Sequence, residues 1–142
     1  NFDFVGAIDH SQLKRQMEEL DVLLFLSTAE SFSLAALEAM ASGAVVVASN
    51  VGAYPDLIED GANGFMVELF PAGLSNYDAP KSLSDSQLKA VTAKLKYIND
   101  LPKSELDKVR RAARHTVEQR FGWSAIAGQI HSSVYQPVVK QT

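Results

Sequence analysis

The sequence has 142 residues, 46% of them hydrophobic and 21% charged, which is enough for one folded domain with a hydrophobic core. Its net charge of −4 argues against a nucleic-acid-binding surface. It contains no cysteine, which excludes disulfides, cysteine-ligated zinc and thiol catalysis, and its apolar runs are shorter than the roughly 20 residues of a membrane span.

The first half of the chain alternates between predicted strands and predicted helices. Apolar runs predict strands at Phe2–Val5, Val22–Leu26, Ala44–Ala48 and Phe65–Val67. The second and third runs have the unbroken apolar pattern of strands that are buried on both faces. Helices are expected after a capping box at Asp9–Gln12, from Leu34 to Gly43, and from Pro55 to about Asp60. This alternation predicts an α/β fold with a Rossmann-like parallel sheet and flanking helices.

The second half of the chain has a different character. Residues 69–86 are rich in turn-forming residues and are expected to form an irregular insertion. Extra C-terminal helices are expected at Asp85–Asn99, at Lys103–Arg120 and, with Ser124 as cap, up to Tyr135. We therefore expect one domain over residues 1–142, divided into an α/β core (1–68), the insertion (69–86) and C-terminal helices (87–142).

Two further expectations concern these C-terminal helices. Trp123 is expected to anchor them as a buried aromatic residue. The densest basic group, Arg110, Arg111 and Arg114, is expected to lie on a solvated helix face.

A ligand site is expected at the carboxyl ends of the strands, where the loops Ser27–Ser33 and Ser49–Tyr54 lead into helices. Helix N-termini offer free N–H groups to phosphate. Glu30 lies in the first loop. Glu38, in the following helix, is the only charged side chain from Ser31 to Pro55, and we expect it to be partly desolvated. Amides suit phosphates and carboxylates suit vicinal hydroxyls, so a nucleotide sugar would fit.

Several other kinds of site can be excluded because their motifs are missing from the sequence. The sequence has no dinucleotide-binding or P-loop glycine motif, no HExxH zinc motif and no GxSxG elbow. Ser33 is either a helix cap or a ligand contact. His10 is expected at the surface, at the start of a helix.

Several segments together carry a family resemblance. They are the Glu-x7-Glu motif from Glu30 to Glu38, its Ala-Met-Ala-Ser-Gly continuation, Val51-Gly52, and Leu57–Val67 with its Asp-Gly-Ala-Asn-Gly turn. In combination they resemble the group 1 (family 4-like) retaining glycosyltransferases, which use nucleotide sugars and have the two-domain GT-B fold. The resemblance extends from about Phe2 to Val67 and implies that this chain is part of the C-terminal, donor-binding domain.

The resemblance also implies a donor site. Glu30 would face the donor sugar and Glu38 the ribose, with the loop backbone close to the sugar and diphosphate. The donor-binding residues predicted in this way are Glu30, Ser31, Phe32, Ser33, Leu34, Glu38 and Gly52. The family often has Glu-Gly-Phe-Gly here, and a serine at the second glycine narrows the room for backbone approach to a ligand. No catalytic residue is assigned, and no metal or cofactor is expected.

The resemblance places other parts of the enzyme upstream of Phe2. These parts are the acceptor-binding domain, the first strands, and an Arg and a Lys that neutralise the diphosphate. We therefore expect hexosyl transfer to an acceptor by the full-length protein and no activity of the isolated chain. The Phe2–Val5 strand should lack its neighbours and be irregular or intermolecular, leaving an exposed edge at Val22–Leu26 that can self-associate. We expect a cytoplasmic protein, or a peripheral membrane protein at full length.

Two alternatives to a glycosyltransferase stay open. The first is a non-catalytic GT-B-like assembly or regulatory module, which Ser31, Ser33 and the missing basic pair favour. The second is a nucleotide-sugar epimerase.

Overall fold

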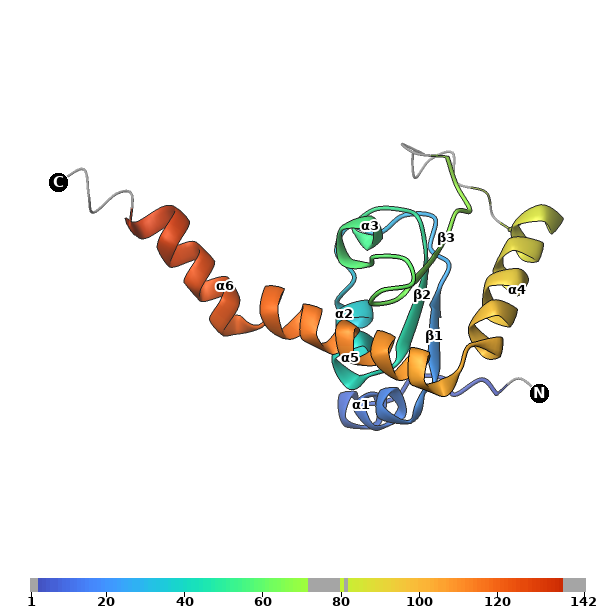
Figure 1. The fold of residues 1–142 in the computed structure, drawn as a ribbon, viewed down its shortest axis with the longest axis horizontal. Coiled ribbons are helices and arrows are strands. Elements are labelled where there is room, and N and C mark those ends of the chain that lie inside the picture. Colours follow the sequence, from blue (N-terminus) through green and yellow to red (C-terminus); the bar gives the residue numbers. More distant parts are fainter. Residues whose placement is uncertain (1–2, 72–79, 81, 137–142) are drawn as a thin grey trace.

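The computed structural model describes residues 3–71, 80 and 82–136. Phe2 and most of the predicted insertion lie outside the described residues. The elements are, in chain order, α1 (His10–Glu19), β1 (Val22–Phe25), α2 (Leu34–Ser42), β2 (Val45–Ser49), α3 (Tyr54–Leu57), β3 (Phe65–Val67), α4 (Asp85–Asp100), α5 (Lys103–Arg120), α6 (Trp123–Ile130) and the π-helix η2 (His131–Tyr135) (Figure 1). Among the described helices, none is both long and apolar enough to cross a bilayer.

The strands form a parallel sheet in the order β1-β2-β3. Val22 pairs with Val45, and Val47 pairs with Phe65. All of β2 is buried, because it has a strand on each side and both α2 and α5 pack on it. α4 stands beside β3, as Figure 1 shows. The predicted parallel α/β sheet with flanking helices is therefore confirmed.

The first strand of the sheet, β1, lies at an edge. Residues 3–5 form no strand, and the Phe4 side chain is 98% exposed. The predicted strand at Phe2–Val5 is therefore wrong for the described residues, whereas its expected irregular placement is confirmed. β1 is only half-buried, so Val22–Leu26 is not buried on both faces as predicted. A strand with one neighbour leaves a row of backbone groups unpaired, and the expected free edge is present.

Local signals determine where most of the helices begin and end. The Asp9 carboxylate accepts a hydrogen bond from the Gln12 amide (2.8 Å) and the Gln12 side chain accepts one from the Asp9 amide, which confirms the predicted capping box. α2 ends at Gly43, whose φ of 89° is the left-handed conformation of a helix C-cap. α3 ends at Leu57, earlier than predicted, because Asp60 already belongs to the turn that leads into β3.

The helix α6 extends away from the sheet (Figure 1) and buries none of its side chains. Its N-cap is Gly122, which makes no side-chain cap, so the predicted cap at Ser124 is wrong. Trp123 is 88% exposed, so its predicted role as a buried anchor is also wrong. The helix exists as expected, but only Ala125 and Ile126 of its apolar residues are half-buried, and Trp123 and Ile130 are exposed.

Arginine side chains tie α5 to the rest of the domain. Arg114 donates hydrogen bonds to the carbonyls of Ala41 (2.9 Å) and Ser42 (3.2 Å), at the C-terminal end of α2. Arg110 forms an ion pair with Asp21 (2.8 Å), just before β1. The predicted solvated basic face is confirmed for Arg111 and Arg114, which are exposed, and is wrong for Arg110, which is half-buried. A cation at a helix C-terminus satisfies carbonyls that lack helical partners and interacts favourably with the helix dipole.

Replacing Arg114 with alanine should lower the free energy of unfolding by about 1 kcal/mol, because the last carbonyls of α2 lose a charged donor. Urea denaturation of the protein measures this loss. The matched control is Arg111→Ala on the exposed side of the same helix, which should change stability by less than about 0.5 kcal/mol. Equal losses in the two variants would contradict the capping role of Arg114.

Candidate functional site

The loops after β1 and β2 meet at one edge of the sheet. Because β1 and β2 are parallel neighbours, the segments Ser27–Ser33 and Asn50–Ala53 both follow carboxyl ends of strands. The Ser49 hydroxyl, at the end of β2, donates a hydrogen bond to the Ser27 carbonyl (2.5 Å). The predicted ligand site therefore consists of two loops in direct contact.

Glycine at position 52 permits the closest of these contacts. Gly52 has a φ of 55°, and a Cβ atom added to it would lie 1.7 Å from the carbonyl oxygen of Glu30. No side chain fits at that distance, so the backbone of the first loop rests directly on the second loop. The Glu30 backbone is thereby held in place by a residue that was itself predicted to belong to the site.

The side chain of Glu30 is held by Tyr54, the first residue of α3, which follows the second loop directly. The phenol of Tyr54 lies 3.4 Å from Glu30 Oε2 and 3.4 Å from Ser33 Oγ. Glu30 itself is half-buried. Tyr54 was not among the predicted site residues, and its only signal in the sequence was an aromatic residue in a loop that follows a buried strand.

Ser33 is the N-cap of α2, which confirms one of its two predicted roles. Its buried hydroxyl accepts a hydrogen bond from the Ala36 amide (3.4 Å). The side chain therefore lies beneath the loop and leaves the outer surface to its neighbours. Those neighbours, Ser31, Phe32 and Leu34, are exposed. The Leu34 amide donates to the Phe32 carbonyl (3.1 Å).

Glu38 is exposed, so the prediction that it is desolvated is wrong. The buried face of α2 consists of Ala36, Leu37, Ala39 and Met40. Leu34, Ala35 and Ala41, each about one turn from Glu38, are themselves exposed. Apolar neighbours on a helix bury a carboxylate only if another part of the protein covers that face, and here the sheet covers the other one.

Glu38 instead opens onto a pocket of about 190 Å³ between α2 and α1. The other residues that line it are His10, Leu13, Lys14, Met17, Ala41 and Ser42. His10 lies exposed at the start of α1, as predicted. Lys14 places a positive charge in the pocket that holds Glu38, a proximity that the sequence analysis did not predict. The spacing of four residues between His10 and Lys14 was the available signal, since it puts both on one helix face.

The helix α1, which carries His10 and Lys14, starts at the N-cap residue Asp9. The Ser11 hydroxyl and the Gln12 amide donate hydrogen bonds to Asp9, and they hold the pKa of this carboxyl below its ordinary value. The cap fixes the first turn of α1, on which His10 lies.

The two glutamates therefore lie in different surroundings. Glu30 is half-buried and held by the second loop, whereas Glu38 is exposed and faces α1. Each is an acceptor that can receive hydrogen bonds from hydroxyl groups of a ligand. Within the described residues, no group of three or more His, Asp or Glu side chains is arranged to hold a metal ion.

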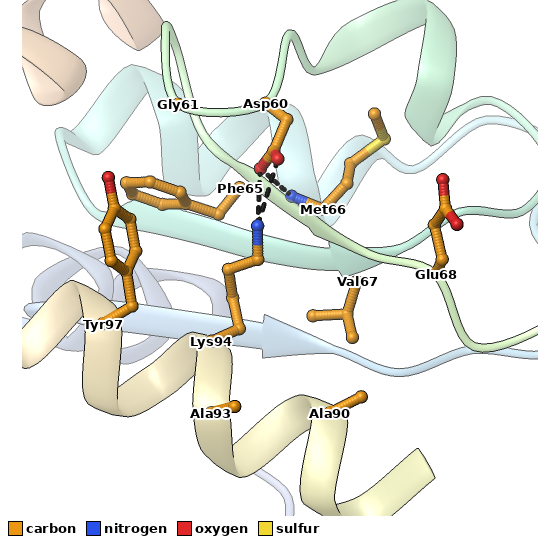
Figure 2. Close-up of a pocket in the computed structure, with 10 residues that line it drawn as sticks. All are labelled: Asp60, Gly61, Phe65, Met66, Val67, Glu68, Ala90, Ala93, Lys94 and Tyr97. Atoms are coloured by element: carbon orange, nitrogen blue, oxygen red, sulfur yellow. Dashed lines mark hydrogen bonds and ion pairs between the residues drawn. The ribbon is translucent and has the colours of Figure 1, made fainter. Parts of the chain in front are cut away.

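A wider pocket of about 700 Å³ lies between β3 and α4. Figure 2 shows Lys94 reaching from α4 to Asp60, at 3.0 Å. Asp60 also accepts a hydrogen bond from the Met66 amide (2.8 Å), and Tyr97 packs edge-on against Phe65. Asp60 and Lys94 of this pocket are thus paired with each other. The pocket contains none of the predicted donor-binding residues, and we interpret it as a structural junction.

Comparisons with known proteins were consistent with one another. A family model described as glycosyl transferases group 1 matches residues 1–74. The phosphatidyl-myo-inositol mannosyltransferase of Mycobacterium tuberculosis is 31% identical over 136 residues, which are 95% of this chain and 32% of that enzyme.

The chain is also similar in fold to solved structures. Sucrose-phosphate synthase from Thermosynechococcus elongatus has a TM-score of 0.69 and 26% identity, over 99% of this chain and 31% of the synthase. Anabaena Alr3699/HepE, solved in complex with UDP, has a TM-score of 0.61 and 26% identity, over 85% of this chain and 29% of that protein. The chain thus spans about a third of the length of these relatives.

Replacing Gly52 with alanine should disrupt the site, because its Cβ would overlap the Glu30 carbonyl. The matched control is Gly61→Ala, which has a similar positive φ of 80° but nothing within 4 Å of the added atom. The control should lose about 1 to 2 kcal/mol from the left-handed backbone alone. Gly52→Ala should lose at least about 2 kcal/mol more. Urea denaturation of both variants measures the difference, and equal losses would contradict the close contact between the loops.

Proposed function

The chain belongs to the group 1 glycosyl transferase family, and we propose that it is the part of the full-length protein that binds the nucleotide-sugar donor. In this proposal the whole protein transfers a hexosyl group, with retention, to an acceptor bound elsewhere in the protein. The observation that carries the proposal is the joined pair of loops at the carboxyl edge of the sheet, with Glu30 held inside it and Glu38 exposed on α2, the helix that follows the first loop.

The proposed donor lies across the start of α2. The backbone of Phe32, Ser33 and Leu34 faces the sugar and diphosphate, because the positive end of a helix dipole favours anions. Glu30 accepts hydrogen bonds from sugar hydroxyls, and Glu38 accepts them from the ribose. Support for a nucleotide ligand comes from Anabaena Alr3699/HepE, which was solved with UDP.

These residues contribute binding and orientation of the donor. Holding the sugar in a fixed position lowers the entropic part of the barrier to transfer. Carboxylates that are placed before the donor arrives recognise its hydroxyls without rearrangement. Proton transfer is assigned to no residue of this chain.

Calorimetry of the full-length protein with UDP-glucose, GDP-mannose and ADP-glucose tests the proposal. One of these donors should bind, and Glu38→Ala should weaken its binding about tenfold to a hundredfold, because hydrogen bonds to a charged acceptor are lost. Glu19→Ala is the matched control, since Glu19 is exposed at the end of α1, at the opposite edge of the sheet.

The alternatives make different predictions in the same experiment. Absence of donor binding, or binding that is insensitive to Glu38→Ala, would support a non-catalytic assembly module. Conversion of the sugar without an acceptor would support an epimerase.

The isolated chain should not transfer sugar. Its two site loops contain no lysine or arginine, so a diphosphate there would meet carboxylates with little charge compensation. A radiolabelled-donor transfer assay on residues 1–142, beside the full-length protein, measures this. Transfer by residues 1–142 alone would contradict the division of the site that we propose.

A further inference from the structure

The phenol of Tyr54 occupies a position that donor binding alone does not explain. Tyr54 is 0% exposed, and its ring packs against Phe25 of β1 with centroids 6.0 Å apart. A buried phenol requires a hydrogen-bond partner. Within the described residues, its hydroxyl has two recorded partners, Glu30 Oε2 and Ser33 Oγ, each at 3.4 Å.

Tyr54, at the start of α3, thus contacts both the middle and the end of the first loop. Glu30 is the predicted contact of the donor sugar, and Ser33 caps the helix at which the diphosphate is proposed to lie. The phenol carries a single hydrogen, so it can donate to only one of these oxygens at a time. The charged carboxylate is the stronger acceptor of the two.

We propose that Tyr54 is a positioning residue for the donor sugar, which holds Oε2 of Glu30 so that the second carboxylate oxygen is directed to the sugar hydroxyls. This inference rests on the proposed function. The separations of 3.4 Å are long for hydrogen bonds between oxygens. Contacts of this kind in ligand-free sites often tighten when the ligand binds. The phenol is therefore placed to hold the Glu30 carboxylate when the donor binds.

Two features keep the phenol and Glu30 in this position. The Glu30 backbone cannot move toward the second loop, because its carbonyl already rests on Gly52. The Tyr54 ring cannot move away, because it is fully buried against the sheet. Glu30 is thus held at its backbone by Gly52 and at one carboxylate oxygen by Tyr54, two residues further along the chain.

Tyr54→Phe in the full-length protein tests the proposal, since it removes the hydroxyl and keeps the buried ring. Calorimetry is performed with the nucleotide sugar that the wild type binds, among UDP-glucose, GDP-mannose and ADP-glucose, and with the matching nucleoside diphosphate. Affinity for the nucleotide sugar should fall about tenfold, while affinity for the diphosphate stays within about twofold. Tyr97→Phe is the matched control, since this tyrosine is exposed on α4, and it should change neither affinity.

Two results would overturn the inference while leaving the proposed function intact. The first is unchanged affinity for the nucleotide sugar. The second is an equal loss of affinity for both ligands, which would indicate a structural role alone. A wild type that binds none of the three donors would instead overturn the proposed function and, with it, the donor role of Tyr54.

A double-variant cycle tests the contact without any ligand. Glu30→Ala, Tyr54→Phe and the double variant of the full-length protein are compared by urea unfolding. If the two side chains share one interaction, the double variant should unfold at the same midpoint as the less stable single variant. Shifts of the midpoint that simply add would overturn the contact on which the inference depends.

Discussion

The shape of the site depends on the contact between Gly52 and the Glu30 carbonyl. Parallel pairing of β1 with β2 brings two loops to the same edge of the sheet, but it does not by itself join them. They join because position 52 carries no Cβ, which would otherwise lie 1.7 Å from the carbonyl oxygen. With the backbones in contact, the Tyr54 hydroxyl lies 3.4 Å from the Glu30 carboxylate. A larger residue at position 52 would separate the loops and remove this support.

Features that depend on residues within one helical turn could be predicted from the sequence. The capping box at Asp9 and Gln12, the cap at Ser33 and the helix end at Gly43 are all present, because each arises from a backbone group and a side chain only a few positions away. The parallel sheet was predictable for a related reason. When apolar strands alternate with amphipathic helices along the chain, few arrangements other than a parallel sheet covered by helices bury the strands and the apolar helix faces together.

Features that depend on which surface the rest of the protein covers could not be predicted. Helical periodicity identified the neighbours of Glu38, but the sheet covers the opposite face of α2, so this carboxylate is exposed. Trp123 is exposed for a similar reason, because α6 leaves the domain. The role of Tyr54 arises from a contact with Glu30, 24 positions away, and depends on the register of β1 against β2. No local pattern in the sequence encodes that distance.

The surroundings of the two glutamates indicate how binding is divided within the proposed function. Glu30 is half-buried and fixed by the second loop, so it can contribute selectivity for the arrangement of sugar hydroxyls. Glu38 is exposed and lines a pocket together with Lys14 of α1, so it contributes an acceptor that solvent also reaches. Neither site loop supplies a cation for a diphosphate. On this proposal, the chain recognises the hydroxyl groups of the donor, and the affinity for its phosphates comes chiefly from cations elsewhere in the full-length protein.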